Sequence, residues 1–271
     1  RDVAPSRGLG DVYKRQALVI AGPGSGKTTV IVNRVYNLII KHNIKPSSIL
    51  VITFTKAAAV SMKERFMSLE GSLNVPVTFG TFHAVFFTIL RHAYNYSVNS
   101  IITRDLQYNF IRDKLISFEL EYSDENETVN SILSQISKVK NDCLNIDEYI
   151  STACPDETFR IIYKEYGKML ISRRLIDYDD MVVLCNELLT QRADYKAAWQ
   201  DKYKYILIDE FQDINKMQFD TIKLIAGESA NIFAVGDDDQ SIYGFRGSKP
   251  DIMLAFKAVS YTHLRAHETE L

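Results

Sequence analysis

The sequence predicts an α/β protein whose parallel β-sheet is interrupted by a mostly helical insertion. Short apolar runs rich in β-branched residues lie before residue 80 and after residue 204, and none lies between about 92 and 190. Most of these runs are continuously hydrophobic, which is typical of strands covered by helices on both faces. The expected strands are 18–21, 49–52, 77–79, 205–208 and 232–235.

Helical segments connect the expected strands, as a parallel sheet requires. The expected helices are 28–42, 57–69 and 81–94 after the first three runs, and 215–226 between the last two. The run 205–208 has no strand beside it in the sequence, so we expect it to pair with the earlier strands. The insertion would then separate two halves of one sheet.

The segment between the two halves has apolar residues close to the helical period, such as Ile132, Ile136 and Val139. It is also acidic. From His92 to Leu188 there are 10 basic and 17 acidic residues, a net charge of −7, whereas the remaining residues carry 22 basic and 17 acidic, a net charge of +5. Two compositional units are therefore expected. The asparagine-rich, acidic stretch 123–130 is expected to be a loop.

The composition excludes several classes of protein. With 46% hydrophobic and 24% charged residues, the chain fits a soluble globular protein and not a disordered or collagenous one. No apolar run approaches the roughly 18 residues of a membrane span. The three cysteines form no C-x-x-C pair, which fits a reducing cytoplasm. Taken alone, the total net charge of −2 would argue against a protein coated in nucleic acid, but the total is misleading because the two regions carry opposite net charge.

A glycine-rich string between the first expected strand and helix predicts a phosphate-binding loop. Its glycines allow successive backbone N–H groups to converge on phosphate oxygens, and the following helix N-terminus adds positive potential. Lys27 would reach the β- and γ-phosphates, and the Thr28 hydroxyl would bind Mg²⁺. We expect ATP and Mg²⁺ as cofactors. The expected nucleotide-binding residues are Ala21, Gly22, Pro23, Gly24, Ser25, Gly26, Lys27, Thr28 and Thr29.

Two features of this loop limit its interpretation. Ala21 stands where the strict pattern has its first glycine, although the rest of the motif is intact. A dinucleotide-binding loop would need a third glycine at position 27, where the sequence has lysine, so that alternative is rejected.

A pair of carboxylates follows the fourth expected strand. Ligands gather at the carboxyl ends of parallel strands, so Asp209 and Glu210 should face the phosphate loop. Asp209 is a candidate magnesium ligand, and Glu210 can draw a proton from the attacking water. The pair predicts ATP hydrolysis. Without the phosphate loop, two carboxylates after a strand would be read as an ordinary solvated turn.

The string after the fifth expected strand contains a glutamine followed by aromatic residues and an arginine. Gln240 could bond both the γ-phosphate and the attacking water, so we assign the catalytic set as Lys27, Glu210 and Gln240. Tyr243, Phe245 and Arg246 are suited to stacking on unpaired bases and contacting their phosphates. Taken alone, those three residues would be read as a turn that packs its aromatics into the core.

These strings and their order resemble the UvrD/Rep-like superfamily 1 DNA helicases from about residue 17 to residue 257. The resemblance is carried by 21–28, 52–59, 80–83, 209–213 and 236–247, and by 175–180 at the return from the insertion. It implies a first motor domain of RecA-like fold, a P-loop NTPase split by a helical subdomain. It also implies that Phe54, Thr55 and His83 line the path of single-stranded DNA with Tyr243, Phe245 and Arg246. Phe245 stands where tryptophan is common, so stacking would use a smaller ring.

The resemblance implies the N-terminal motor half of an ATP-dependent, 3′ to 5′ DNA helicase, an ATP hydrolase that translocates on single-stranded DNA in repair or replication restart. The expected partners are single-stranded DNA, single-strand/double-strand junctions, the second motor domain of the same chain and accessory repair proteins, with no membrane. Because two motor domains must close on ATP, we expect these 271 residues alone to bind ATP and DNA weakly, to hydrolyse little ATP and not to unwind DNA. The alternatives are a RecB- or AddA-like helicase-nuclease and a non-motor nucleotide-dependent DNA-binding module; a kinase or transport ATPase is less well supported.

The expected domain limits follow from the same resemblance. Residues 17–91 and 191–257 would form the motor domain, and 92–190 the helical insertion. Residues 1–16 lack the family's glutamine motif, and 258–271 no longer resemble the family. We expect both tails to be foreign to the gene.

Overall fold

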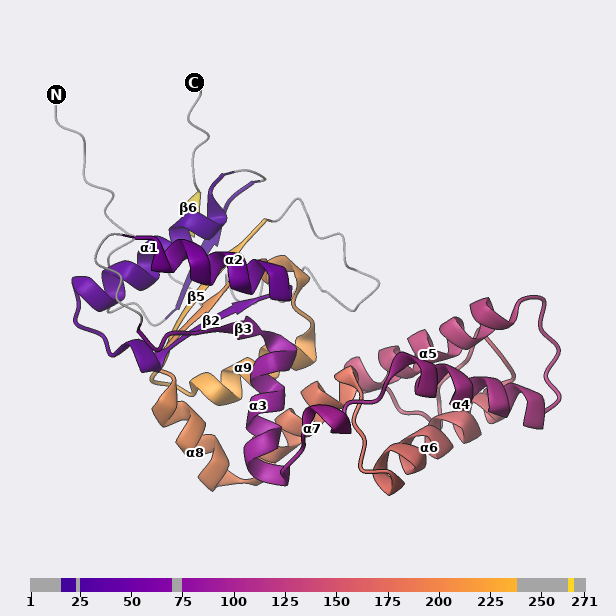
Figure 1. The fold of residues 1–271 in the computed structure, drawn as a ribbon. Coiled ribbons are helices and arrows are strands. Elements are labelled where there is room, and N and C mark those ends of the chain that lie inside the picture. The colour runs from indigo at the N-terminus through magenta and orange to yellow at the C-terminus, as the bar shows by residue number, and fades with distance from the viewer. Residues whose placement is uncertain (1–15, 23–24, 70–74, 238–262, 266–271) are drawn as a thin grey trace. The chain divides into compact units, whose positions relative to one another are not determined.

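The computed structural model describes residues 16–22, 25–69, 75–237 and 263–265. The chain divides into two compact units (Figure 1). The first contains the described residues up to Val85 and those from Leu188 onward, and the second is Phe86–Glu187. The second unit is therefore inserted, in sequence, into the first.

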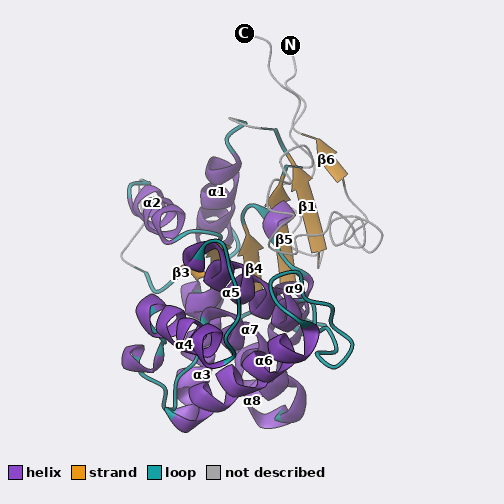
Figure 2. Cartoon of the chain, turned by 90° about the vertical axis from the view of Figure 1, so that its right-hand side faces the viewer, coloured by secondary structure: helices purple, strands orange, loops and turns teal. Residues whose placement is uncertain are grey.

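Within the described residues, six strands form one sheet in the order β3-β2-β4-β5-β1-β6, and each pair of neighbouring strands is parallel (Figure 2). Five strands match the apolar runs, which confirms the predicted α/β fold with a parallel sheet. The three-residue β6 was not predicted, because one leucine between two polar residues has no strand-like pattern. The bounds are β1 Gln16–Ile20, β2 Ile49–Thr53, β3 Thr78–Thr81, β4 Tyr205–Ile208, β5 Asn231–Gly236 and β6 His263–Arg265.

The strand that follows the second unit in sequence returns to the middle of the sheet. β4 pairs with β2 on one side and β5 on the other, so Ile208 lies opposite both Ile52 and Ala234. This pairing confirms that the helical insertion separates two halves of one sheet.

Helices cover both faces of this sheet (Figure 1). α1 (Lys27–Ile40) and α2 (Lys56–Met67) bury Ile31, Val35 and Met62 in a common core with strand residues such as Val51. α8 (Ala193–Lys202) and α9 (Lys216–Ala226) lie on the opposite face. α8 was not anticipated, because Trp199 is its only buried residue and its sequence has no apolar stripe. Short 3-10 helices, η1 (Pro46–Ser48) and η3 (Phe211–Asp213), complete the described connections of this unit.

The second unit is helical, as predicted. α4 (Arg104–Ser117), α5 (Glu125–Asn141) and α6 (Asp156–Ser172) enclose an apolar core, and the unit boundaries fall within α3 (Phe82–Tyr94) and α7 (Tyr178–Gln191). The chain entering this core, after η2 (Val98–Ser100), meets the chain leaving it at a parallel bridge between Ile101 and Ile176. The core residues are Ile102, Ile111, Leu115, Val129, Ile132, Ile136, Val139, Phe159, Ile162, Tyr166, Met169 and Leu170.

The loop predicted over 123–130 is wrong, because α5 already begins at Glu125. Asp124 is the N-cap: its carboxylate accepts a hydrogen bond from the Glu127 backbone N–H at 2.9 Å. Glu125 and Glu127 lie in the first turn, where the helix dipole stabilises negative charge. The acidic composition that suggested a loop is thus a helix start.

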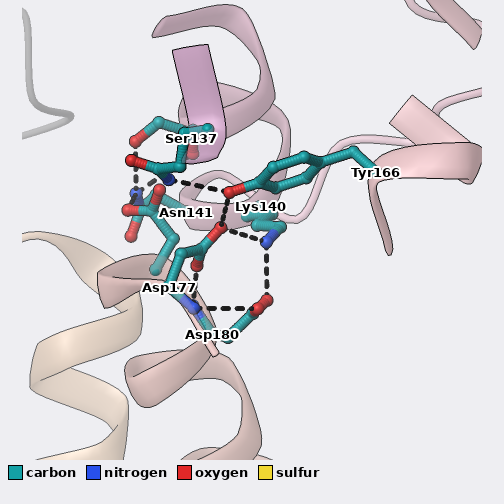
Figure 3. Close-up of polar contacts among 8 residues, drawn as sticks. Ser137, Lys140, Asn141, Tyr166, Asp177 and Asp180 are labelled. Atoms are coloured by element: carbon teal, nitrogen blue, oxygen red, sulfur yellow. Dashed lines mark hydrogen bonds and ion pairs between the residues drawn. The ribbon is translucent and has the colours of Figure 1, made fainter. Parts of the chain in front are cut away.

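A buried ionic cluster joins α5, α6 and the start of α7 (Figure 3). Lys140 Nζ lies 2.7 Å from Asp177 and 2.6 Å from Asp180. Asp177 also accepts a hydrogen bond from the Tyr166 hydroxyl at 3.1 Å, and its other oxygen accepts from the Asp180 backbone N–H, as at an N-cap. Beside this group, the Asn141 amide donates to Asp179 at 2.7 Å. Residues 175–180, at the end of the insertion, are therefore bonded to α5 and α6.

Burial and mutual charge determine the protonation of this cluster. Burial and the neighbouring charge of Asp177 raise the pKa of Asp180 to about 6. Burial alone would lower the pKa of Lys140, but the two carboxylates outweigh it and the pKa is raised. Lys140 is therefore a permanently charged centre of the second unit.

Replacing Lys140 with methionine should lower the free energy of unfolding by about 3 kcal/mol, since it leaves the buried carboxylates without their cation. Urea denaturation of the chain measures this. Lys138→Met, on an exposed position of the same helix, is the matched control and should change the value by less than about 0.5 kcal/mol. Equal effects of the two substitutions would contradict the assigned role.

The pH dependence of stability should carry the signature of Asp180. Its pKa of about 6 in the folded chain exceeds the ordinary value of 3.8, so its contribution is fully present below about pH 4 and is lost as pH rises through 6. The stability of the wild type minus that of Asp180→Asn should fall by about 2 kcal/mol between pH 4 and pH 7. Urea titrations at several pH values test this, and a difference that is constant or rises would contradict it.

Candidate functional site

The predicted motifs of the first unit meet at one edge of the sheet. All five main strands run parallel, so the residues that follow them lie at the same, carboxyl, edge. Across this edge, the strand order places the segments after β3 and β2 on one side, and those after β5 and β1 on the other, with β4 between. The segments begin at Phe82, Phe54, Asp209, Asp237 and Ala21.

The phosphate loop depends on a left-handed residue at its end. Gly26 has φ +80° and immediately precedes the first residue of α1, Lys27. Only glycine adopts this conformation without strain, so the motif residue type is dictated by the backbone. The first N–H groups of a helix, here at Lys27, Thr28 and Thr29, have no acceptor within the helix and are a typical binding site for an anion. Pro23 and Gly24 lie outside the described residues.

The start of the loop is fixed to β5. The Ala21 backbone N–H donates to the Gly236 carbonyl at 3.0 Å, and Ser25 Oγ donates to the Gly22 carbonyl at 2.6 Å. Ala21 is 5% exposed, which leaves its methyl group inside the core. The departure from glycine at this position is therefore accommodated.

Lys27 lies against the carboxylates that follow β4 and β5. Its Nζ is 3.1 Å from Glu210 Oε2 and 3.8 Å from Asp237 Oδ2. The Lys27 side chain is only 10% exposed and that of Asp237 1%, whereas that of Glu210 is 36% exposed. Two residues 183 positions apart in sequence are thus brought into contact, with Glu210 at the solvent side.

Asp209 presents a buried anionic oxygen suited to a cation. Within the described part of the chain, its Oδ1 has no hydrogen-bond partner, and the same is true of Asp213 Oδ1. Burial and the charge of Glu210 raise the pKa of each carboxyl group to about 6. Hard oxygen donors and uncompensated negative charge fit Mg²⁺. The residues that could hold it are Asp209 and Thr28.

No group of three or more His, Cys, Asp or Glu side chains is arranged as metal ligands among the residues that the structure describes. A magnesium ion of a nucleotide site does not need one, because it takes one or two protein oxygens and completes its octahedron with phosphate and water.

Sequence reasoning missed Gln212, the amide within the Asp-Glu-Phe-Gln-Asp string. Its Nε2 donates to Glu210 Oε2 at 2.8 Å, and its Oε1 accepts from the Asp237 backbone N–H at 2.9 Å. Asp213 was missed as well. A neutral amide between carboxylates carries no charge signal, so only its position inside the motif could have drawn attention to it.

The described candidates for DNA contact follow the two adjacent strands β2 and β3. Phe54 and Thr55 come directly after β2, and His83 lies in the first turn of α3 after β3. Thr55 Oγ1 accepts from the Ala58 N–H at 3.1 Å, so it also caps α2. Phe54 and His83 are half-buried. The other candidates for DNA contact, Tyr243, Phe245 and Arg246, lie outside the described residues, as does the catalytic candidate Gln240.

Known proteins resemble this chain in sequence. Residues 9–260 match the UvrD/REP helicase N-terminal domain, so the chain belongs to this family. It is 35% identical over 246 residues to a probable DNA helicase II homolog of Mycoplasma capricolum, covering 88% of this chain and 34% of that protein. It is 37% identical to a putative ATP-dependent DNA helicase, YjcD, of Bacillus subtilis, covering 89% and 32%. It is 34% identical to the ATP-dependent DNA helicase Rep of Escherichia coli, covering 86% and 35%.

The chain spans about a third of the length of these curated relatives. Family membership confirms the predicted RecA-like α/β fold, and two of these relatives carry names that describe ATP-dependent DNA helicases. Among the described helices, none has both the length and the apolarity of a membrane span.

Substituting Gly26 with alanine should lower the free energy of unfolding by about 1 kcal/mol, because alanine is strained at φ +80°. Gly22→Ala is the matched control: a Cβ at Gly22 meets nothing within 4 Å, and this position is not among the described glycines with positive φ. Its effect should be below about 0.5 kcal/mol. Thermal or urea unfolding compares the two, and equal losses would contradict the backbone argument.

Proposed function

We propose that this chain is the ATP-binding motor part of a DNA helicase that couples Mg-ATP hydrolysis to movement along single-stranded DNA. The observation that carries the proposal is the 3.1 Å contact between Lys27 of the phosphate loop and Glu210 after β4. A cation that can bind phosphate and a carboxylate that can activate water then lie together at the carboxyl edge of the sheet. The DNA helicases of Mycoplasma, Bacillus and Escherichia that the chain resembles support it.

Lys27 changes partner during the proposed cycle. In the structure its charge is neutralised by Glu210 and Asp237. The β- and γ-phosphates carry more negative charge than the carboxylates, so on binding ATP Lys27 turns to them. Glu210 is then released to accept the proton of the attacking water. The ion pair thus keeps the base inactive until the substrate is present.

Thr28 and Asp209 would hold the magnesium ion, which when bound neutralises the charge that develops on the phosphates. Asp209 contributes the buried oxygen that lacks a partner among the described residues. Gln240 is the proposed third catalytic residue, bonding the γ-phosphate and the attacking water. The remaining loop residues bind the phosphates through backbone N–H groups.

Single-stranded DNA is proposed to cross the β3 and β2 side of the same edge, over Phe54, Thr55 and His83. Adjacent strands are about 4.8 Å apart, so four strand spacings put β3 at about 19 Å from β1. That separation leaves room for a strand of DNA beside a nucleotide. Tyr243, Phe245 and Arg246 would stack on bases and contact the backbone.

The finer attributes of the activity are also proposals. They are 3′ to 5′ polarity, action at single-strand/double-strand junctions in DNA repair, accessory repair proteins as partners and a cytoplasmic location. The motor domain is proposed to comprise 17–91 and 191–257, and the insertion 92–190. A single motor domain cannot close on ATP from both sides, so these 271 residues should bind ATP and DNA weakly and not unwind duplexes.

Lys27→Met should weaken binding of a fluorescent ATP analogue at least tenfold, whereas Glu210→Gln should leave the affinity within about threefold and lower hydrolysis about 100-fold. Equilibrium titration and single-turnover hydrolysis with and without single-stranded DNA measure these effects. The control is Lys41→Met, an exposed lysine at the other end of α1.

A rate of ATP hydrolysis that rises when single-stranded DNA is added supports a motor. A rate that does not change with DNA contradicts one. DNA binding that depends on ATP but is unchanged in Lys27→Met would favour the non-motor nucleotide-dependent module. Equal nucleotide affinity of Lys27→Met and the wild type would overturn the proposed site.

A further inference from the structure

Gln212 occupies a bridging position that the hydrolysis scheme above does not use. Its side chain lies between the Glu210 carboxylate and the backbone at the end of β5, and the residue is 6% exposed. It belongs to η3, the short helix that turns the chain away from β4. Glu210, just before it, has φ +51°, a conformation that non-glycine residues rarely adopt.

The two hydrogen bonds of Gln212 fix the orientation of its amide. A carboxylate only accepts and a backbone N–H only donates, so the NH₂ group must face Glu210 and the carbonyl oxygen must face Asp237. Turning the amide around would break both bonds and oppose acceptor to acceptor. The bridge therefore has a single geometry.

The bridge closes a ring of contacts around the phosphate loop. Lys27 contacts Glu210, Glu210 accepts from Gln212, and Gln212 accepts from the Asp237 N–H. The residue before Asp237, Gly236, accepts from the Ala21 N–H at the start of the loop that ends in Lys27. A displacement of the backbone at Asp237 can therefore be transmitted to the Glu210 carboxylate through the Gln212 side chain.

We propose that Gln212 is a positioning residue that holds the Glu210 carboxylate in place and ties it to the backbone that follows β5. The catalytic consequence rests on the proposed function, since it requires Glu210 to be the base. Gln212 itself touches neither nucleotide nor water in this scheme. It acts through Glu210, so its loss should reduce turnover and not nucleotide affinity.

Hydrogen exchange tests the link without any catalytic activity. The Asp237 backbone N–H should exchange at least tenfold faster in Gln212→Met, which removes its acceptor. The same N–H should also exchange several-fold faster in Glu210→Ala, because Gln212 then loses the carboxylate that accepts its NH₂ group. Neither of the two hydrogen bonds above joins Glu210 to that N–H directly. Exchange is measured by NMR on the complete 271-residue chain.

Gln218→Met is the matched control. Gln218 is also 6% exposed, and its amide oxygen accepts from the Asn215 N–H in the capping box of α9. Removing it deletes a buried amide a few residues away without touching Glu210, so exchange at Asp237 should stay within twofold of the wild type. An unchanged rate in Glu210→Ala, or equal rates in Gln212→Met and Gln218→Met, would overturn the proposal.

Single-turnover ATP hydrolysis tests whether Gln212 affects catalysis. Gln212→Met should lower the rate at least tenfold with the affinity for the ATP analogue within twofold, and Gln212→Glu should lower it further because it places a carboxylate beside Glu210. The double variant Gln212→Met/Glu210→Gln should be no slower than Glu210→Gln alone. Additive losses would contradict action through Glu210.

The two arms separate the two proposals. Absence of Lys27-dependent hydrolysis in the wild type counts against the proposed function alone, and the exchange rates at Asp237 still decide whether Gln212 links Glu210 to β5.

Discussion

The contact between Lys27 and Glu210 is the interaction on which the site depends. It requires the residues after β1 and β4 to lie at the same edge of one parallel sheet, with β5 between these strands. The whole second unit lies between β3 and β4 in the sequence, and β4 nevertheless pairs with both β2 and β5. The hydrophobic strands thus determine the position of the charges: burial on both faces fixes the sheet, and the sheet fixes which polar ends meet.

Buried charge is treated in two different ways in the two units. In the second unit, Lys140 Nζ contacts both Asp177 and Asp180, and Asp177 also accepts from Tyr166, so a cation and a hydroxyl compensate the carboxylates (Figure 3). At the sheet edge, Asp209 keeps a buried oxygen without a hydrogen-bond partner among the described residues, and its pKa is raised to about 6. A satisfied cluster stabilises a fold, whereas an unsatisfied one costs stability and favours binding of a cation.

Sequence patterns predicted the parts of the molecule in which one strong signal repeats. Continuous apolar runs located β1 to β5, and the phosphate loop and Asp-Glu pair located Lys27 and Glu210. Signals that are short or ambiguous failed: β6 has one apolar residue, α8 buries only Trp199, and the acidic start of α5 resembled a loop until Asp124 was seen as its cap. The role of Gln212 could not be predicted from the sequence. It depends on a hydrogen bond from the backbone N–H of Asp237, which follows β5, and a neutral amide gives no sign of such a partner.

The most direct test of this account is a crystal structure of the chain with Mg²⁺ and a non-hydrolysable ATP analogue. The account predicts Lys27 Nζ at hydrogen-bonding distance from the β- and γ-phosphates, separated from Glu210, with Asp209 beside the ion. A nucleotide bound elsewhere, with the Lys27–Glu210 pair intact, would contradict it.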